Sequence, residues 1–568
     1  MVYADKKKSF MKTDKIVIAI FLILICILIP TVILLSWVPP VSRDALTHHL
    51  AVPKIYLQHG GMVELPHIPF SYFPMNLDLL YMVPLSLGND ILPKLIHFLF
   101  GLLIAGVIFK FVKNRFGLTY ALFGVLFFLS LPVIIKLSTT VYVDLGLVFF
   151  STAALLALFK WGRDKTSCRY FLVSAVFCGL ALGTKYNGLV TLFILTIFVP
   201  FIYLRYGNRQ TTRQFSAAGL SIAYLVIALT VFAPWMVRNA IWTGNPIYPL
   251  YNRVFSAASA PAAEEIPPEV QAAIKKHTQD WNHLAIRRII YGESWGEIAL
   301  IPIRIFFQGQ DNTPQYFDGK LNPFLLFLTL LAFFPKPRLQ QPFRLERNIL
   351  AAFVILFLLI SFFKTSIRIR YIAPVLPPLV ILSCYGLNNV VSFFQARKHP
   401  AAVLAGLSAV IIAAVLLFGM NTFYILEQFH KIDPLSYISG RMKREAYIAK
   451  HRPEYPVLKY ANQNLEETDK ILGLYLGNRR YFCDRTLIFG EKKLTRSIIM
   501  ASSAEDVRAS LRQSGYTHVI VHLNLLKQWA GSLNDRERRI TADLFNNHME
   551  LIKQNQEYSL FALNQDAH

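Results

Sequence analysis

Eleven apolar runs, each close to the length that crosses a bilayer, constrain the fold more than any other feature of this chain. A spanning helix needs about 20 mostly apolar residues, because it rises 1.5 Å per residue through about 30 Å of hydrocarbon. The runs cover approximately residues 16 to 36, 91 to 111, 118 to 135, 143 to 160, 170 to 184, 188 to 204, 216 to 236, 321 to 335, 348 to 363, 372 to 391 and 400 to 422. We therefore predict an α-helical polytopic membrane protein with about 11 transmembrane helices.

The composition supports this class and argues against the other classes that the net charge would suggest. Hydrophobic residues make up 54% and charged residues 16% of the chain, which is typical of a membrane protein. The formal net charge is +24, but most Lys and Arg lie in short loops beside apolar runs, so we predict no nucleic-acid partner. The five cysteines form no CxxC pair, so neither a disulfide framework nor a zinc site is indicated.

The basic residues also predict the orientation. If the N-terminus is cytoplasmic, five basic clusters fall inside, as the positive-inside rule requires; they lie at 110 to 115, 160 to 169, 205 to 213, 336 to 347 and 397 to 398. The first run follows Lys6 to Lys8 but is too long for a signal peptide, so we expect it to be retained. The predicted location is a bacterial cytoplasmic (inner) membrane.

This orientation places two long loops, 37 to 90 and 237 to 320, and the segment after about 422 on the outer side. We predict two domains, a transmembrane catalytic domain over 1 to 422 and a small periplasmic α/β domain over 423 to 568. In the second domain, the apolar pattern predicts buried strands at 470 to 476 and 516 to 523. It predicts an amphipathic helix at 504 to 514. Residues 551 to 563 are expected to form a hairpin.

The first outer loop contains the strongest catalytic candidate, Asp44. Ser42 is a plausible N-cap, which places Asp44 in the first helical turn, with His48 one turn later on the same face and His49 beside it. An acid at a helix N-terminus is also favoured by the helix dipole without any catalytic role. Its place just beyond the first span, where a lipid substrate would present its headgroup, favours the catalytic interpretation.

Two further acids are expected at the same membrane boundary. Asp78 lies in an apolar, aromatic stretch, and Asp144 heads the fourth run, where capping is again an alternative. Since the spans contain almost no acids, three acids at one boundary indicate a shared site. We treat Asp44, Asp78 and Asp144 as catalytic candidates.

Basic and polar residues on the outer turns provide the complementary half of the site. Lys185, Tyr186 and Asn187 form a tight turn; Arg238 and Asn239 follow the seventh run; and Lys364, Arg368, Arg370 and Tyr371 lie in or beside another turn. Either these cations are tolerated exceptions to the positive-inside rule, or they bind the phosphate of a lipid carrier.

Signatures of other enzyme classes are missing from the sequence, which has no GxxxxGK[ST], HExxH or GxSxG motif. His48, His49, His277 and His283 could join Asp44 in a divalent metal site, but their spacing matches no recognised ligand set. No cofactor is therefore certain.

In this order, the motifs resemble the GT-C class of polytopic glycosyltransferases, in particular its bacterial protein-mannosyltransferase-like and aminoarabinose-transferase-like members. They are the Asp after the first span (Asp44), FP-x3-D (Phe73 to Asp78), Tyr-x-Asp (Tyr142 to Asp144), Thr184-Lys185, RNxxxTGNPIYP (Arg238 to Pro249) and RYxxPxxP (Arg370 to Pro377). The chain differs from the best-known members in having Ala45 after Asp44 rather than a second acid.

The resemblance implies a polyprenyl-phosphate sugar donor, reaction on the extracytoplasmic side and Asp44 as general base. The acceptor stays open between a glycolipid such as lipopolysaccharide, a surface polysaccharide and a protein. Two alternatives are a transporter or flippase of lipid-linked glycans, which would place ionisable groups inside the membrane, and a non-catalytic scaffold.

Overall fold

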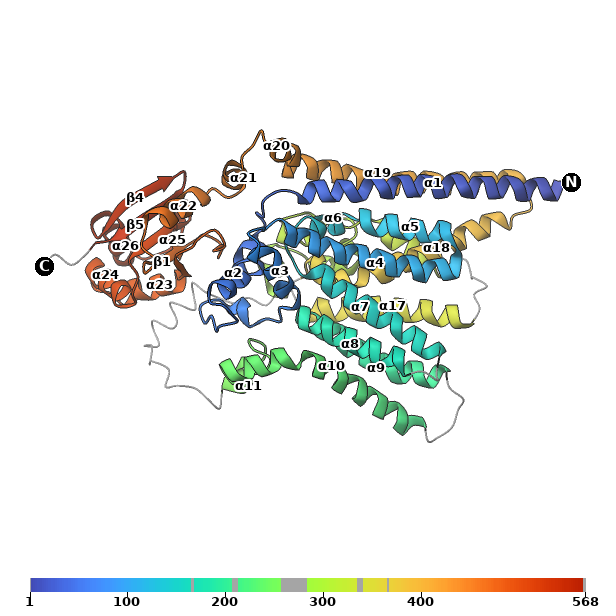
Figure 1. Ribbon diagram of the computed structural model, residues 1–568, viewed down its shortest axis with the longest axis horizontal. Helices are drawn as coiled ribbons and strands as arrows, with labels where there is room; N and C mark the ends of the chain where they lie inside the picture. Colours follow the sequence, from blue (N-terminus) through green and yellow to red (C-terminus); the bar gives the residue numbers. More distant parts are fainter. Residues whose placement is uncertain are drawn as a thin grey trace.

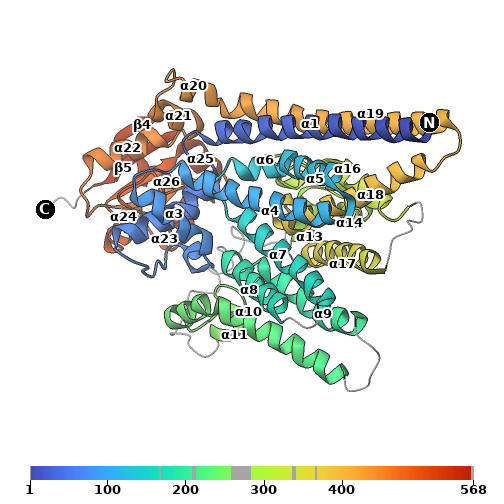
Figure 2. The same ribbon diagram turned by 45° about the vertical axis from the view of Figure 1, so that its right-hand side comes forward.

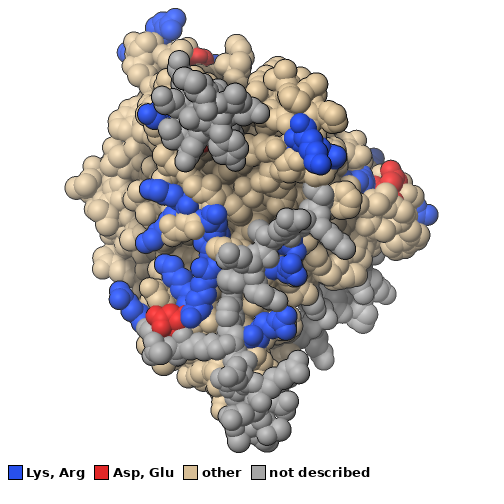
Figure 3. All heavy atoms as spheres, turned by 90° about the vertical axis from the view of Figure 1, so that its right-hand side faces the viewer, with Lys and Arg blue, Asp and Glu red and all other residues tan. Residues whose placement is uncertain are grey.

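A computed structural model of the chain describes residues 2–164, 168–206, 213–256, 283–334, 341–364 and 367–564. Figure 1 shows a bundle of roughly aligned helices with the C-terminal sheet domain at one end and the N-terminus at the other. We refer to these as the sheet end and the basic end of the bundle. Lys and Arg side chains are spread across the basic end, with few acidic residues among them (Figure 3).

Within the described residues, eight helices are long and apolar enough to cross a membrane. They are contained in α1 (Val2–Ser36), α4 (Leu92–Phe116), α7 (Asp144–Arg163), α9 (Gly188–Tyr206), α10 (Arg213–Thr243), α17 (Gln341–Lys364), α18 (Leu376–Gln395, preceded by η5, Ile369–Val375) and α19 (Pro400–Ile432). The long helices α1 and α19 run side by side along one edge of the bundle (Figures 1 and 2). The predicted polytopic helical class is confirmed.

The other three predicted spans are helical but differ from the prediction. The run 118 to 135 forms α5 (Leu118–Ser130) and α6 (Pro132–Ser138), which are bent by 64°, because Pro132 disfavours helical backbone at the residue before it. The run 170 to 184 forms the shorter α8 (Arg169–Thr184), and 321 to 335 contains only the short α16 (Phe324–Leu331).

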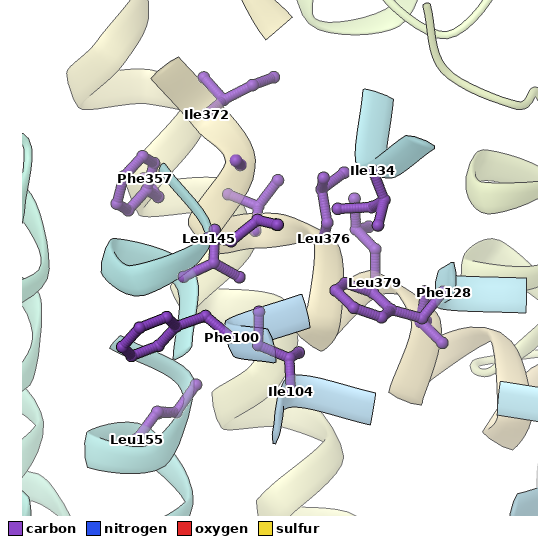
Figure 4. Close-up of a cluster of buried hydrophobic side chains, with 14 of the residues drawn as sticks. Phe100, Ile104, Phe128, Ile134, Leu145, Leu155, Phe357, Ile372, Leu376 and Leu379 are labelled. Carbon is purple, nitrogen blue, oxygen red and sulfur yellow. The ribbon is translucent and has the colours of Figure 1, made fainter. Parts of the chain in front are cut away.

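The core of the bundle is formed by large apolar side chains from several spans. Figure 4 shows Phe100 and Ile104 of α4 close to Leu145 and Leu155 of α7, with side chains of α17 and α18 nearby. All these positions are buried. A helix buried on all sides needs apolar residues around its whole circumference, which explains why these runs show no clear amphipathic pattern.

The two long loops, 37 to 90 and 237 to 320, form short helices. The first contains η1 (Ala45–His49), α2 (Ala51–Gln58), η2 (Pro69–Tyr72) and α3 (Asn76–Ser86). The second contains α11 (Asn252–Ser256), α13 (His283–Ala285), η3 (Ile286–Ile290), α14 (Trp295–Ala299), α15 (Ile301–Arg304) and η4 (Pro314–Tyr316). His277 lies outside the described residues.

The C-terminal domain is a mixed five-stranded sheet with the order β2-β1-β3-β5-β4. Its elements are α20 (Pro434–Ile438), α21 (Arg444–His451), α22 (Tyr455–Asn464), β1 (Lys470–Leu474), β2 (Thr486–Phe489), α23 (Glu491–Met500), α24 (Ala504–Gln513), β3 (His518–His522), α25 (Leu523–Ala530), α26 (Asp535–Asn547), β4 (Met549–Asn555) and β5 (Tyr558–Leu563). Strands β1 to β3 pair in parallel and β5 pairs antiparallel with β3 and β4. The two strands, the helix and the hairpin expected from sequence are present, whereas β2, only four residues long, was not predicted.

Candidate active site

The segment that holds Asp44 is not a regular α-helix. Residues Ala45–His49 form a π-helical turn, in which the amide of Leu50 donates to the carbonyl of Ala45 at 2.9 Å. A π turn contains one residue more than an α turn, so His48 and His49 are rotated relative to Asp44 from the positions that an α-helix predicts. The ring of His48 stacks on Phe70 at a centroid distance of 4.5 Å and lies 4.0 Å from the ring of His49.

Asp44 forms an ion pair with Arg370, a residue 326 positions away in the sequence. The Arg370 guanidinium donates to Oδ2 of Asp44 at 2.5 Å. The Asp44 side chain makes no cap hydrogen bond to the turn that follows it, so its charged partner is Arg370 and not the backbone of this turn. The guanidinium also lies 4.9 Å from the ring centre of Tyr142 and 5.1 Å from that of Tyr371, which hold it over the carboxylate.

The other two candidate acids are also paired. Nδ1 of His49 lies 2.7 Å from Asp78, and Nζ of Lys185 donates to Asp144 at 2.7 Å. Asp144 lies in the first turn of α7, but its Oδ2 is buried without a hydrogen-bond partner among the described residues, so its side chain does not cap this helix. The exposed fraction of the side chain is 24% for Asp44 but only 3% for Asp78 and 1% for Asp144. Asp44 is therefore the most exposed of the three acids.

Close backbone packing brings the Lys185 turn to this cluster. A Cβ atom on Gly183 would come within 2.4 Å of the Asn76 side chain, so only glycine allows the end of α8 to approach the start of α3 this closely. Asn76 in turn accepts a hydrogen bond from the indole of Trp235 at 2.8 Å. The predicted site residues of three separate loops are thus brought together.

Two cavities meet at the Asp44–Arg370 pair. The smaller, of about 90 Å³, is lined by His48, His49, Asp78, Lys185 and Tyr371 together with the pair itself. The larger, of about 420 Å³, is also lined by Asp44 and Arg370, and its walls include Lys136, Arg368 and residues of α19 and α21. The ion pair therefore forms part of the wall of each cavity, and a ligand in either one can reach it.

Local charges keep Asp44 ionised. Burial acts to raise the pKa of Asp44, but the nearby Arg370, His48 and His49 outweigh it and hold the pKa well below its usual range. Burial, reinforced by His49, lowers the pKa of His48 well below its ordinary value. Its Nδ1 is buried and has no hydrogen-bond partner among the described residues.

Three of the predicted substrate-binding residues line neither cavity. They are Arg238, Asn239 and Tyr186. Arg238 donates to the carbonyl of Phe73 at 3.2 Å, and Asn239 donates to the carbonyl of Tyr72 at 2.9 Å. The hydroxyl of Tyr186 donates to the carbonyl of Tyr248. These residues hold the Phe73-Pro74 segment that leads into α3 and Asp78.

A second cluster of charges in the larger cavity was not identified from sequence. Nζ of Lys136 lies 3.2 Å from Asp311 and 3.3 Å from Asp318, and Arg368 lies 3.5 Å from Asp318. The amide of Ile369 donates to the carbonyl of Phe317 at 2.8 Å, which ties this loop to the segment that carries Arg370. Two acids within eight residues, just before the eighth apolar run, were the available signal.

The C-terminal domain contacts the π-helical turn Ala45–His49 directly. The amides of Arg480 and Tyr481 both donate to the carbonyl of Leu46, each at 3.0 Å. Lys54 of α2 donates to the carbonyl of Tyr481 and to Asp484. Asp90 accepts from Arg444 at 2.5 Å and from the hydroxyl of Tyr481 at 3.2 Å. The loop 479–484 thus holds the turn that places Asp44, His48 and His49.

A metal site is not assembled by the described part of the chain, which contains no group of three or more His, Cys, Asp or Glu side chains suited to hold a metal ion. Nε2 of His283 donates to the carbonyl of Phe362 at 3.2 Å, and His277 lies outside the described residues. A divalent metal at Asp44 stays a prediction.

Residues 88–237 match the sequence profile of the family described as dolichyl-phosphate-mannose-protein mannosyltransferase. The structure is similar to the crystal structure of ArnT from Cupriavidus metallidurans bound to undecaprenyl phosphate, with a TM-score of 0.56 and 13% identity over 96% of this chain and 98% of that chain. It is also similar to the Archaeoglobus fulgidus oligosaccharyltransferase tethered with an acceptor peptide, with a TM-score of 0.52 and 11% identity over 95% of this chain and 74% of that chain. Comparison with curated protein sequences gives no match.

The chain therefore has the fold of the polytopic membrane glycosyltransferases of the GT-C class, and the resemblance drawn from its motifs is confirmed. The shared fold extends over the helical bundle and the C-terminal sheet domain, since almost the whole of both chains is covered in the ArnT comparison.

Proposed function

We propose that this protein transfers a sugar from a polyprenyl-phosphate donor to an acceptor, with Asp44 as the general base and inversion at the anomeric carbon. The observation that carries the proposal is the Asp44–Arg370 pair, which forms a wall shared by two cavities. A group-transfer enzyme needs this arrangement, because donor and acceptor must approach the same reacting atoms from opposite sides.

In the proposed reaction, Asp44 removes a proton from an acceptor hydroxyl or amine. The acceptor atom forms a bond to the anomeric carbon while the bond from that carbon to the phosphate oxygen breaks, and the electron pair leaves with the phosphate. One displacement inverts the configuration and requires no covalent enzyme intermediate. Arg370 and Lys185 stabilise the charge on the departing phosphate.

The ion pair implies a change on donor binding. While Arg370 is bound to Asp44, the low pKa of Asp44 makes it a weak base. The donor phosphate competes with Asp44 for the guanidinium, so its binding releases the carboxylate and raises its basicity. Asp78 and Asp144 act as positioning residues through His49 and Lys185, whereas Arg238 and Asn239 support the loop before α3.

The donor class is supported by fold and chemistry together. The similar ArnT structure holds undecaprenyl phosphate, and the matched family is described by a dolichyl-phosphate sugar; both are polyprenyl phosphates. The acceptor, whether glycolipid, polysaccharide or protein, is not distinguished by these observations. We place the basic end in the cytoplasm and the C-terminal domain in the periplasm of a bacterial inner membrane, supported by the Lys and Arg of Figure 3.

The test is transfer from a radiolabelled polyprenyl-phosphate sugar by membranes containing the wild type or Asp44→Asn. Loss of the base should reduce the transfer rate by about 10²- to 10⁴-fold. Glu64→Gln is the matched control, because Glu64 lies in the same loop but binds Tyr72 instead of the Arg370 group. Wild-type transfer by a correctly inserted Asp44→Asn variant would remove Asp44 as the base. Movement of the intact lipid-linked glycan without sugar transfer would identify a transporter instead.

A further inference from the structure

A separate cavity of about 460 Å³ opens at the basic end of the bundle, far from the site described above. Its walls come from the C-terminal parts of α4 and α7, the start of α8 and the start of α17. Five cationic residues line it, against one carboxylate, that of Glu346. The cationic residues are Lys110, Arg115, Lys160, Arg163 and Arg169.

The single acid neutralises only part of this charge. Glu346 is fully buried and accepts two hydrogen bonds from Arg115, each at 2.8 Å, and lies 2.6 Å from Arg163. Lys110 and Lys160 form no ion pair within the described ranges; Nζ of Lys160 lies over the ring of Tyr170 at 5.3 Å. Arg115 and Arg163 are thus held by Glu346, whereas Lys110 and Lys160 have no acidic partner among the described residues.

The positive-inside rule explains cations at this end but not their convergence on one cavity. That rule concerns short loops, whereas Lys110 and Arg115 belong to α4 and Lys160 and Arg163 to α7. Below the basic rim the walls are apolar, with Val107, Phe149 and Phe177 among them. From Lys160 to Phe149 the lining extends along α7 by about 16 Å at 1.5 Å per residue.

We propose that this cavity binds an anionic phospholipid of the adjacent leaflet, with its phosphate between Lys110 and Lys160 and an acyl chain along the apolar wall. A free phosphate ion would use the basic rim alone, whereas the apolar depth favours a ligand that is anionic at one end and apolar at the other. Basic pockets between membrane helices recognise such headgroups. Occupancy would tie α4 to α7 at the end of the bundle opposite the catalytic turn.

The experiment is native mass spectrometry of the full-length protein purified with equal amounts of phosphatidylglycerol and phosphatidylcholine. The wild type should retain one phosphatidylglycerol, and Lys110→Gln/Lys160→Gln should retain about tenfold less, since each lysine near a membrane contributes to headgroup binding. Lys113→Gln/Arg397→Gln is the matched control, with the same charge change outside the cavity lining, and should retain the lipid as the wild type does.

A second variant tests the acyl-chain part without altering any charge. Ala153 lines the apolar wall, so Ala153→Phe should displace the lipid while the basic rim stays intact. Equal loss of phosphatidylglycerol in the two double variants would overturn the proposal in favour of a diffuse positive surface. Retention of phosphatidylcholine equal to that of phosphatidylglycerol would do the same. A different result would favour a free anion as the ligand. In that case millimolar inorganic phosphate would displace the lipid, and Ala153→Phe would retain as much phosphatidylglycerol as the wild type; this would overturn the proposal.

Discussion

The two ends of the bundle contain similar residues in opposite electrostatic arrangements. At the sheet end, Arg370, Lys185 and His49 each lie within 2.7 Å of a carboxylate. At the basic end, five cationic residues line a cavity with one carboxylate. Paired charges must be separated before a ligand can use them, whereas uncompensated ones attract an anion at once. This difference is the basis of the two proposals, a reaction centre at the sheet end and a lipid-binding site at the basic end.

The largest difference between the two ends should appear in stability. Lys185→Gln leaves the buried Asp144 without its cation, which should lower the free energy of unfolding by about 3 to 5 kcal/mol. Lys160→Gln removes a charge that has no acidic partner in the described structure. This substitution should change the free energy of unfolding by less than about 0.5 kcal/mol. Thermal unfolding in detergent compares the two, with Lys185→Arg as the control that keeps the charge. Equal effects would show that the pairing at the sheet end is not structural.

Arg370→Gln should alter both the rate and its pH dependence. Loss of this cation should reduce transfer by about 10²- to 10³-fold. In the wild type the pKa of Asp44 is low, so Asp44 stays ionised as the pH falls to about 4 and kcat/KM shows no acid limb from it. Without Arg370, burial dominates and raises the pKa of Asp44, so an acid limb should appear at higher pH.

The comparison of pH profiles of kcat/KM checks this sign. Arg368→Gln serves as the control, because Arg368 pairs with Asp318 rather than with Asp44. An identical acid limb in the wild type and Arg370→Gln would show that Arg370 does not set the basicity of Asp44.

A smaller change in the transfer rate is expected when the contact between the C-terminal domain and the π-helical turn Ala45–His49 is weakened. Asp90→Asn removes the charge that binds Arg444 and Tyr481, and hydrogen bonds of this kind contribute about 1.5 to 3 kcal/mol. Hydrogen exchange at residues 45–49 should increase and the transfer rate should fall several-fold. Asp484→Asn, which breaks an exposed pair with Lys54, should have less effect. Unchanged exchange in Asp90→Asn would show that the domain does not hold the turn.

Much of the fold follows from local sequence. Length and apolarity identified the helical runs, and the strands β1 and β3 are continuous apolar segments. The same reasoning failed where tertiary packing decides the structure. The bend at Pro132 and the short α16 interrupt runs that are apolar throughout, because a residue buried in protein need not lie in a spanning helix.

The site was predictable as a set of residues but not as a set of contacts. Sequence order predicted that Asp44, Asp78, Asp144, Lys185 and Arg370 lie at one membrane boundary, and the structure brings them into one cluster. The partner of each acid depends on how distant loops fold, so the pairing of Asp44 with Arg370 could not be read from spacing. The π turn and the hydrogen bonds of loop 479–484 to Leu46 are likewise set by tertiary contacts.

The most direct test of Asp44 as the general base measures donor binding and sugar transfer separately in one variant. Purified Asp44→Asn is titrated with the polyprenyl phosphate, and sugar transfer is then followed in a single turnover. Because the substitution frees Arg370 for the phosphate, we expect the variant to bind the polyprenyl phosphate at least as tightly as the wild type. We expect sugar transfer to be slower by about 10²- to 10⁴-fold. Transfer at the wild-type rate, or loss of donor binding as the sole defect, would contradict the assignment of Asp44 as the base.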